Sequence, residues 1–360
     1  MQFFICNIFL LKKIKFHEKI VVMPDTVLVT GGAGYIGSHA CKALFLANLR
    51  PIVYDNLSTG HSYAVKWGPL VEGDLFEKEK LVETMRSFGV KAVLHFAASA
   101  LVGESVQNPG LYYRNNVGGS LSLLEAMKET GVNRLVFSST CATYGHPQLT
   151  PISEEHPQNP INPYGKTKWM IEKMIQDFGI RSIILRYFNA AGADEKAEIG
   201  EHHEPETHLL PNLIQSAIGE RNEVLVFGTD FPTKDGSAVR DYIHVSDLAD
   251  AHVLALMALL NDAPSNIYNL GTGVGTSVLE LVDTVQKICC KPFPVRLEAR
   301  RAGDPAILIA DATKARRELG WEPKRSSTEQ MIDTAWKWHV LLQENMPLLR
   351  KIASCASSPT

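Results

Sequence analysis

The sequence predicts an α/β protein with a doubly wound parallel sheet, followed by a smaller mixed α/β C-terminal domain. Short β-branched runs alternate with amphipathic helical patterns over the first half of the chain, which is typical of parallel sheets. A glycine-rich segment joins the first strand to the first helix. After Phe188 the alternation stops, and a stretch rich in Gly, Glu, His and Pro begins.

The predicted elements follow one another at short intervals. Strands are expected at residues 26–30, 51–54, 92–95, 134–137 and 182–185, with a further strand-like run just before Gly73. Helical patterns occupy residues 38–48, 77–88, 116–130 and 164–178. Residues 190–207 predict a long loop, and the remainder mixes helices with short strands.

The bulk composition restricts the class of protein. Hydrophobic residues make up 45% and charged residues 21% of the chain, and the formal net charge is -3. These values favour a globular protein and give no indication of a nucleic-acid or anionic-membrane surface. The six cysteines show no metal-binding spacing, which predicts a reduced, cytoplasmic protein without structural disulfides. They are Cys6, Cys41, Cys141, Cys289, Cys290 and Cys355.

The segment from Thr30 to Gly37 reads TGGAGYIG and contains G-x-x-G-x-x-G between a strand and a helix. Glycines there allow a tight turn and a close approach of the backbone to a pyrophosphate, whose charge the helix start would bind. Asp55 ends the second strand, near the distance at which an acid should hold the adenosine ribose. Its charge would repel a 2′-phosphate. The sequence therefore predicts a Rossmann-like domain that binds NAD rather than NADP.

Tyr164 and Lys168 form a Y-x-x-x-K pair on one face of a predicted helix. A free tyrosine has a pKa near ~10, and lowering it to about 7 requires roughly 4 kcal/mol of differential interaction. A partly desolvated lysine beside a cationic nicotinamide could supply this. Thr140 follows the strand at 134–137, so its hydroxyl is expected at the ligand-binding edge of the sheet. For Ser138 we expect turn capping.

These residues resemble those of the extended short-chain dehydrogenase/reductase superfamily, and within it the chain is similar to the UDP-glucose 4-epimerase (UDP-galactose 4-epimerase) family. The resemblance extends over residues 23–342. It depends on the segments TGGAGYIGSH, YDNLSTG, VGESVQNP, YGKTK, LRYFNAAGA, DYIHVSDLADAH and YNLGTGVG. The family implies that a base takes the proton of a sugar 4-hydroxyl while NAD receives hydride. The 4-keto sugar then turns over, and hydride returns to its opposite face.

The resemblance also implies roles for individual residues. The catalytic group would be Tyr164, Lys168 and Thr140, with Lys168 also holding the nicotinamide ribose. The other NAD contacts would be Gly31, Gly34, Tyr35, Ile36, Gly37, Asp55, Asn56, Asp74, Leu75, Phe96, Ala97, Ala98, Asn115 and Phe188. The nucleotide-sugar would be held by Thr140, Asn189, Leu209, Phe227, Arg240, Arg301 and Asp304. The two arginines suit a diphosphate, because guanidinium presents paired donors to phosphate oxygens.

The expected domains follow from these assignments. Residues 1–22 are interpreted as a dispensable extension, because their apolar run is too short to span a bilayer and their positive charges follow it. Residues 23–188 would form the NAD-binding Rossmann domain, with segments near 239–271 returning to it. Residues 189–345 would mainly bind the nucleotide-sugar, and residues 346–360 would form a tail. The family implies a homodimer formed through a helical face.

Four positions depart from the family pattern. Ala100 replaces a frequent lysine, Thr140 replaces the catalytic serine but keeps its hydroxyl, and His208 replaces an asparagine that often contacts the sugar. Leu308 stands where a larger tyrosine is common. Because of the first three departures, the sugar of the substrate could be a hexose or a pentose. Because of Leu308, an N-acetylhexosamine is also allowed.

Three other functions agree less well with the residues of this chain. A 4,6-dehydratase needs an Asp-Glu pair after Thr140, but Cys141-Ala142-Thr143 follows. A simple dehydrogenase would require free exchange of the cofactor, and a non-catalytic dinucleotide sensor need not keep the Y-x-x-x-K pair. The segment from Glu201 to Glu204 reads EHHE and could suggest a metal. It lacks helical i,i+4 spacing, so a solvated loop without metal is expected there.

Overall fold

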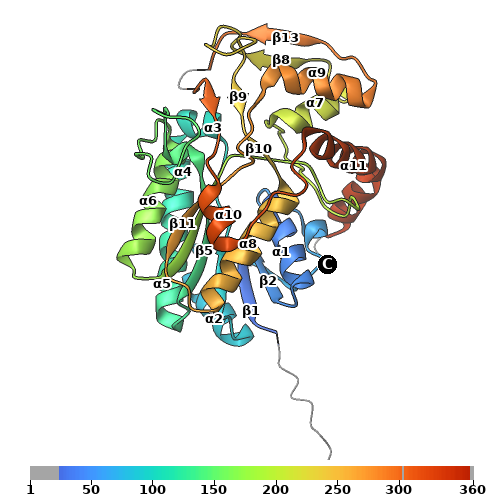
Figure 1. Cartoon of the computed structure of the whole chain (residues 1–360). Coiled ribbons are helices and arrows are strands. Elements are labelled where there is room, and N and C mark those ends of the chain that lie inside the picture. The colour runs from blue at the N-terminus through green and yellow to red at the C-terminus, as the bar shows by residue number, and fades with distance from the viewer. Residues whose placement is uncertain (1–23, 302–303, 357–360) are drawn as a thin grey trace, which may run out of the picture.

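The computed structural model describes residues 24–301 and 304–356, and for residues 346–356 only the backbone (Figure 1). The larger part is a sheet covered by helices on both faces, and a smaller part carries short strands and further helices. The predicted extension at residues 1–22 lies outside the described residues. Within those residues, no helix has the length and apolar character needed to cross a membrane.

The main sheet of the described chain has seven strands in the order β11-β6-β5-β4-β1-β2-β3, and every neighbouring pair is parallel. Its strands are β1 (Thr26–Thr30), β2 (Arg50–Asp55), β3 (Leu70–Glu72), β4 (Ala92–His95), β5 (Arg134–Thr140), β6 (Arg181–Tyr187) and β11 (Asn266–Leu270). The order reverses beside β1, which is the arrangement of a doubly wound sheet. The predicted fold class is therefore confirmed.

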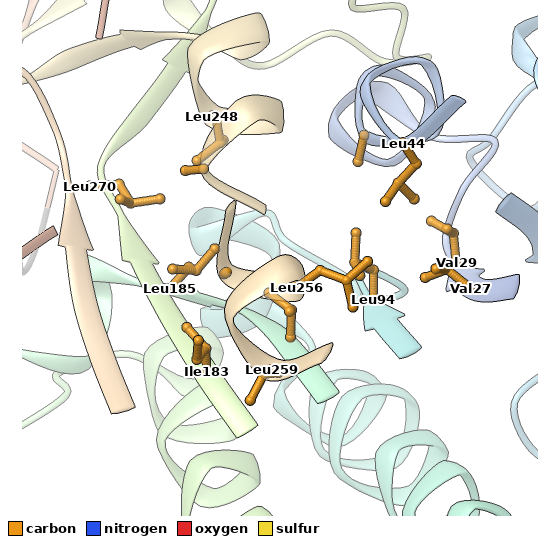
Figure 2. Packing of buried hydrophobic residues seen from close by; sticks show 14 of the residues in the cluster. Val27, Val29, Leu44, Leu94, Ile183, Leu185, Leu248, Leu256, Leu259 and Leu270 are labelled. Carbon is orange, nitrogen blue, oxygen red and sulfur yellow. The ribbon is translucent and has the colours of Figure 1, made fainter. Parts of the chain in front are cut away.

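Two hydrophobic clusters hold the helices against the sheet. On one face, α1 (Tyr35–Leu46) and α8 (Val245–Leu260) pack together over residues such as Val29, Leu94 and Leu185 (Figure 2). On the other face lie α2 (Lys78–Phe88), α5 (Gly119–Thr130) and α6 (Pro163–Asp177). Because the central strands are buried on both faces, they are continuous apolar runs, as parallel sheets require.

The smaller part gathers around a third cluster, which includes Leu213, Val226, Val285 and Ile332. Its helices are α7 (Leu209–Ala217), α9 (Val278–Cys289) and α11 (Thr328–Ala356). Its strands form small sheets: β8 (Val224–Phe227) with β13 (Val295–Glu298), β9 (Val239–Arg240) with β12 (Thr276–Ser277) and β14 (Ile307–Leu308), and β7 (Asn189–Ala191) with β10 (Tyr242–His244). The remaining short elements are η1 (Ser62–Ala64), α3 (Val102–Gln107), α4 (Pro109–Tyr112), η2 (Tyr113–Gly118), η3 (Cys141–Thr143) and α10 (Thr313–Leu319).

Some boundaries differ from the prediction. The strand predicted at 134–137 continues through Thr140, because Ser138–Thr140 pair with Leu185–Tyr187 of β6. The helix predicted from residue 116 is preceded by the π-helical turn η2, a rare element often found at functional sites. Cys41, Cys141, Cys289 and Cys290, the cysteines whose side chains the structure describes, are free thiols.

Candidate active site

The glycine loop between β1 and α1 forms a cradle with room for an anion. A Cβ on Gly31, whose φ is 73°, would lie 2.6 Å from the backbone nitrogen of Ala97, and one on Gly37 would lie 2.1 Å from the Gly31 carbonyl oxygen. At Gly34 the nearest atom would be 3.4 Å away, which is an ordinary van der Waals contact, so the loop is less tightly packed at this position. Gly34 is also the N-cap of α1 and adds no capping side chain, which leaves the first amides of α1 available to a phosphate.

Asp55 lies at the end of β2, directly beside the loop. Its carboxylate is buried and accepts hydrogen bonds from the backbone N–H groups of Ala33, at 3.0 Å, and Leu57, at 2.9 Å. Burial raises the pKa of Asp55, and these two N–H groups oppose the rise. Asn56 donates to Asp74 at 2.7 Å, so the predicted ribose and adenine residues lie together. A shallow hollow of about 340 Å³ opens beside them, lined by Asn56, Glu72, Gly73, Asp74, Glu77 and Lys80.

The remaining predicted cofactor residues lie around this loop. The Phe96 ring lies 4.7 Å from that of His252, next to Ala97 and Ala98. The Asn115 amide donates to the Ser99 hydroxyl at 3.1 Å. Tyr35, Ile36 and Leu75 pack inward: the Tyr35 hydroxyl donates to the Gly192 carbonyl at 2.6 Å, and Ile36 and Leu75 contact the two core clusters.

The fully buried Asn116 was missed in the sequence. Its side chain accepts from the Ser99 N–H at 2.8 Å and donates to the Ser99 carbonyl at 3.0 Å and the Thr167 hydroxyl at 3.1 Å. It therefore joins the segment after β4 to α6. The unusual π-helical turn that presents it has no sequence signature, although the pair Asn115-Asn116 was a visible clue.

Tyr164 and Lys168 lie one turn apart on α6, and both are buried at the carboxyl end of β5. Lys168 donates to the carbonyl oxygen of Ser138 at 2.8 Å and lies 4.9 Å from the centre of the Phe137 ring. Thr140 is the last residue of β5 and also caps η3, since its hydroxyl accepts from the Ala142 N–H at 3.1 Å. Lys168 is held at the Ser138 carbonyl and Tyr164 lies beside the Thr140 hydroxyl, so the three predicted catalytic side chains gather at the carboxyl end of β5.

Burial dominates the electrostatics of this group. It raises the pKa of Tyr164 well above its usual value, and the neighbouring Thr140 hydroxyl works in the opposite direction. Burial also lowers the pKa of Lys168 to about 7, opposed by the charge of Glu172. Without a bound cation beside it, this tyrosine therefore stays protonated at neutral pH.

Two features that build this group have only weak signals in the sequence. Ser138 positions Lys168 through its backbone carbonyl, and its hydroxyl pairs with that of Tyr187 at 2.5 Å, so the expected turn capping by Ser138 is wrong. Gly165 lets α6 approach η3, because a Cβ there would lie 2.4 Å from the Ala142 carbonyl oxygen. A glycine next to the tyrosine was the available clue to the second feature.

A buried ion pair lies beneath the group. Glu172, one turn beyond Lys168, contacts Arg186 through two bonds of 3.0 and 2.6 Å, and it also accepts from Ser139 and Gln158. Both charged side chains are 3% exposed or less. Because all of these donors occupy its carboxylate, Glu172 is not free to act as the acid of a dehydratase.

Apart from Thr140 at the end of β5, the predicted nucleotide-sugar residues lie in the smaller part of the molecule. The Arg301 guanidinium stacks 4.0 Å from the centre of the Phe227 ring, and Arg240 pairs with Asp304 at 2.5 Å. The remaining two are Asn189, the first residue of β7, and Leu209, the first residue of α7. Phe188 is buried with Cys141, Tyr144 and Leu308, so the departure at Leu308 lies close to the predicted nicotinamide contact.

The solvated-loop prediction is wrong for part of the segment from Glu201 to Glu204. Glu201 is only 4% exposed, and it lies beside His203, Glu206 and His208. The chain folds back here, so residues that are not neighbours on a helix come together in a loop.

Residues 27–271 match the family described as NAD dependent epimerase/dehydratase. The UDP-glucose 4-epimerase of Rhizobium meliloti is 52% identical to this chain, over 88% of this chain and 97% of that protein. The chain belongs to this family. The resemblance found in the sequence, to UDP-glucose 4-epimerases, is therefore confirmed.

Solved structures of epimerases share this fold. The UDP-glucose 4-epimerase of Brucella ovis in complex with NAD is 51% identical, with a TM-score of 0.85, over 87% of this chain and 98% of that one. The UDP-glucose-4-epimerase from Stenotrophomonas maltophila has bound NAD and formylated UDP-arabinopyranose. It is 41% identical, with a TM-score of 0.86, over 89% of this chain and 99% of that one. The glycine loop around Gly34 and the carboxylate of Asp55 fit NAD, the cofactor of the epimerase family.

Proposed function

We propose that this protein is an isomerase that interconverts UDP-sugars at C4 with NAD, and that UDP-glucose and UDP-galactose are its substrates. The observation that carries the proposal is the gathering of Tyr164, Lys168 and Thr140 at the carboxyl end of β5, in a sheet whose first strand leads into the glycine-rich loop. Relatives that share the fold over nearly their whole length include UDP-glucose 4-epimerases.

In this proposal Tyr164 is the base for the sugar 4-hydroxyl and the acid when the 4-keto sugar is reduced. Thr140 shares the same hydroxyl proton, and the Ser138 carbonyl fixes Lys168 against the nicotinamide ribose. NAD, when bound, accepts hydride from C4 and returns it to the opposite face. Because the reaction regenerates NAD in each cycle, we expect the cofactor to remain bound through many turnovers.

The burial of Tyr164 determines in which state of the enzyme its hydroxyl can lose a proton. Desolvation holds the Tyr164 proton in place, and it lowers the pKa of the only lysine in the group to about 7. A positive charge on the cofactor would stabilise the tyrosinate directly, and more strongly in a dry site than in water. The buried site therefore reserves proton removal for the state in which oxidised cofactor is present.

The nucleotide would bind in the smaller part of the molecule. The stacked pair of Phe227 and Arg301 offers an apolar face and a cation, and Arg240 offers guanidinium donors beside Asp304. Arginine suits a diphosphate because its planar fork binds two oxygens at once. Asn189 and Leu209, at the starts of β7 and α7, would contact the substrate between these arginines and the catalytic group.

The choice of sugar is a separate part of the proposal. The Stenotrophomonas relative binds a pentose nucleotide, so a UDP-pentose is the alternative substrate. Leu308 packs near Phe188, where its small size leaves room for a 2-acetamido group, so a UDP-N-acetylhexosamine is a further alternative.

We also propose that the enzyme is a cytoplasmic homodimer. The cysteine spacing supports a reducing compartment. Large apolar side chains are exposed on the neighbouring elements α4, η2, α5 and α6, which favours a helical dimer face. They are Leu111, Tyr113, Leu121 and Met170, with exposed fractions of 37–46%.

The test is to supply the purified enzyme with UDP-galactose and to detect UDP-glucose by a coupled assay. Parallel reactions contain a UDP-N-acetylhexosamine or a UDP-pentose. Epimer formation without net NADH production is expected, and it should be fastest with the hexose. If no sugar is epimerised while added NADH is consumed, the protein is a reductase and the proposal is wrong.

A further inference from the structure

A cluster of two histidines and two glutamates lies in the segment between β7 and α7, outside the proposed catalytic group. Glu201, His203, Glu206 and His208 each offer one ligand atom, and these four atoms lie within 4.8 Å of one another. The two carboxylate side chains are only 5% and 2% exposed. Buried carboxylates are costly unless a positive charge lies beside them, so something must neutralise this pair.

The distances within the cluster match those around a tetrahedral metal ion. His203 Nδ1 lies 3.4 Å from Glu201 Oε1 and 3.6 Å from Glu206 Oε2. His208 Nδ1 lies 2.7 Å from Glu201 Oε1 and 3.3 Å from Glu206 Oε1. Zinc bound at 2.0–2.2 Å places its tetrahedral ligand atoms about 3.3–3.6 Å apart. The two distances from His203 Nδ1 are close to this range, and the distance from His208 Nδ1 to Glu201 Oε1 is shorter.

Two atoms aimed into the cluster have no hydrogen-bond partner. Glu206 Oε2 and His203 Nδ1 are both buried and unpartnered, although they lie only 3.6 Å apart. Buried polar atoms of this kind are rare and call for a ligand. The other oxygen, Glu206 Oε1, accepts from the N–H groups of Thr207 at 2.8 Å and His208 at 2.9 Å. These bonds hold the carboxylate so that Oε2 faces inward, as outer contacts do around metal ligands.

Two imidazolium–carboxylate ion pairs are the alternative arrangement, and they would also balance the charge. The 2.7 Å distance from His208 Nδ1 to Glu201 Oε1 suits one such pair. The other pair would need a directed N–H···O bond, which His203 Nδ1 and Glu206 Oε2 do not make. A divalent cation satisfies both atoms at once and neutralises both carboxylates while the histidines stay neutral. We propose that Glu201, His203, Glu206 and His208 bind one divalent transition-metal ion of the zinc type.

The surroundings indicate a structural role for this ion. The Glu201 carbonyl accepts from the Trp338 indole of α11 at 2.8 Å, and His202 pairs with the Tyr63 hydroxyl at 2.7 Å. Leu209, the first residue of α7, follows His208 directly. The ion would therefore fasten the start of α7 to the segment that packs on α11. With four protein ligands, the site has no open position for catalysis. His208 is 46% exposed, which gives the ion a way in.

The experiment measures metal in protein purified without an affinity tag. The protein is stripped with a chelator, dialysed against Zn²⁺ or Co²⁺, and analysed by elemental mass spectrometry. The variants are His208→Ala, at the most exposed ligand, and His203→Ala and Glu206→Gln. His202→Gln is the matched control, because it removes a histidine of the same segment that is not a ligand. Circular dichroism verifies that each variant is folded.

Wild type and the control should retain about one zinc ion per chain, and the three ligand variants almost none. Bound Co²⁺ should show the visible bands of tetrahedral coordination. Stripping should lower the Tm of wild type by about 5 °C and leave that of the folded ligand variants unchanged. The proposal is overturned if folded wild type takes up no ion, or if the ligand variants bind as much as the control. None of these measurements depends on epimerase activity.

Discussion

At the scale of single residues, the central feature is a tyrosine that burial keeps protonated. Tyr164 is 9% exposed, and desolvation raises its pKa, while Lys168 at 3% exposure has its pKa lowered to about 7. The same burial that disfavours both charges in the free protein would strengthen their attraction once a cationic cofactor is present. The two residues form a switch that depends on the cofactor rather than a preformed ion pair.

Tyr164→Phe removes the hydroxyl and leaves the ring packing in place. Since a positioned acid–base group contributes roughly 10²–10⁴-fold, we expect kcat to fall about 10³-fold with KM little changed. Initial rates with UDP-galactose test this. Tyr268→Phe, in β11, is the control and should retain the activity of wild type. Equal loss in both variants would mean that the effect is not catalytic.

Lys168 gives a prediction about stability and pH. Folding lowers its pKa from an ordinary 10.5 to about 7, so the unfolded chain binds the proton more tightly between these values. The buried ammonium therefore opposes folding fully below pH 7, by up to about 5 kcal/mol, and this cost disappears as the pH rises toward 10.5. Stability is therefore lost progressively as the pH falls from 10.5 to about 7, and this lysine causes no further change below that.

Lys168→Met should consequently raise the Tm of NAD-free protein, relative to wild type, more at pH 6 than at pH 10. Differential scanning fluorimetry at the two pH values measures this gap, the difference in Tm between Lys168→Met and wild type. The exposed neighbour Lys166→Met should show no such dependence on pH. A gap of equal size at both values would contradict the lowered pKa.

At the scale of elements, the site depends on how closely α6 approaches the end of β5. Two residues allow this close approach. Gly165 has no Cβ that would collide with the Ala142 carbonyl, and the Asn116 side chain forms hydrogen bonds with both Ser99 and Thr167. The buried pair of Glu172 and Arg186 holds the same helix against β6. These contacts fix Tyr164 relative to Thr140 more tightly than the helix alone could.

Gly165→Ala should move α6 away from η3, because its Cβ would lie 2.4 Å from a backbone oxygen that cannot easily yield. We expect kcat to fall at least about 10²-fold, since small misplacements of catalytic groups have effects of that size. Gly110→Ala is the matched control, because nothing lies within 4 Å of its Cβ position. Steady-state kinetics and the Tm of both variants test this, and wild-type kcat in Gly165→Ala would refute it.

At the scale of the whole molecule, the chain crosses between its two parts more than once. After entering the smaller part, the chain returns to the larger part through β10 and α8. Strand β11 then forms the edge of the main sheet beside β6. The nucleotide-sugar residues and the catalytic group are therefore held by interleaved segments rather than by two separable domains. The division at residue 188 remains a prediction.

The proposed dimer face is tested at this scale. Size-exclusion chromatography with light scattering should give twice the mass of one chain. The double variant Leu121→Glu, Met170→Glu should give a monomer, because charges on an apolar interface are not compensated there. The control is Phe45→Glu with Leu46→Glu, on exposed apolar residues of α1, and it should remain dimeric. A monomeric wild type would remove this part of the proposal.

The sequence by itself predicted the first six strands of the main sheet and the helices between them, but not β11 or α8, and it indicated the glycine loop, Asp55 and the Tyr164–Lys168 pair as site residues. These features are local: side-chain periodicity, turn chemistry and i,i+4 spacing act between residues that are close along the chain. The tertiary structure alone decided the contacts of Ser138 and Asn116, the burial of Glu172 with Arg186, and the cluster around Glu206. Each depends on segments distant in sequence and on exclusion of water, which shifts pKa values and leaves polar atoms unpartnered. The spacing of residues along the chain does not show which side chains are buried. The segment 201–208 was therefore predicted to be solvated, although the structure buries the carboxylates of Glu201 and Glu206.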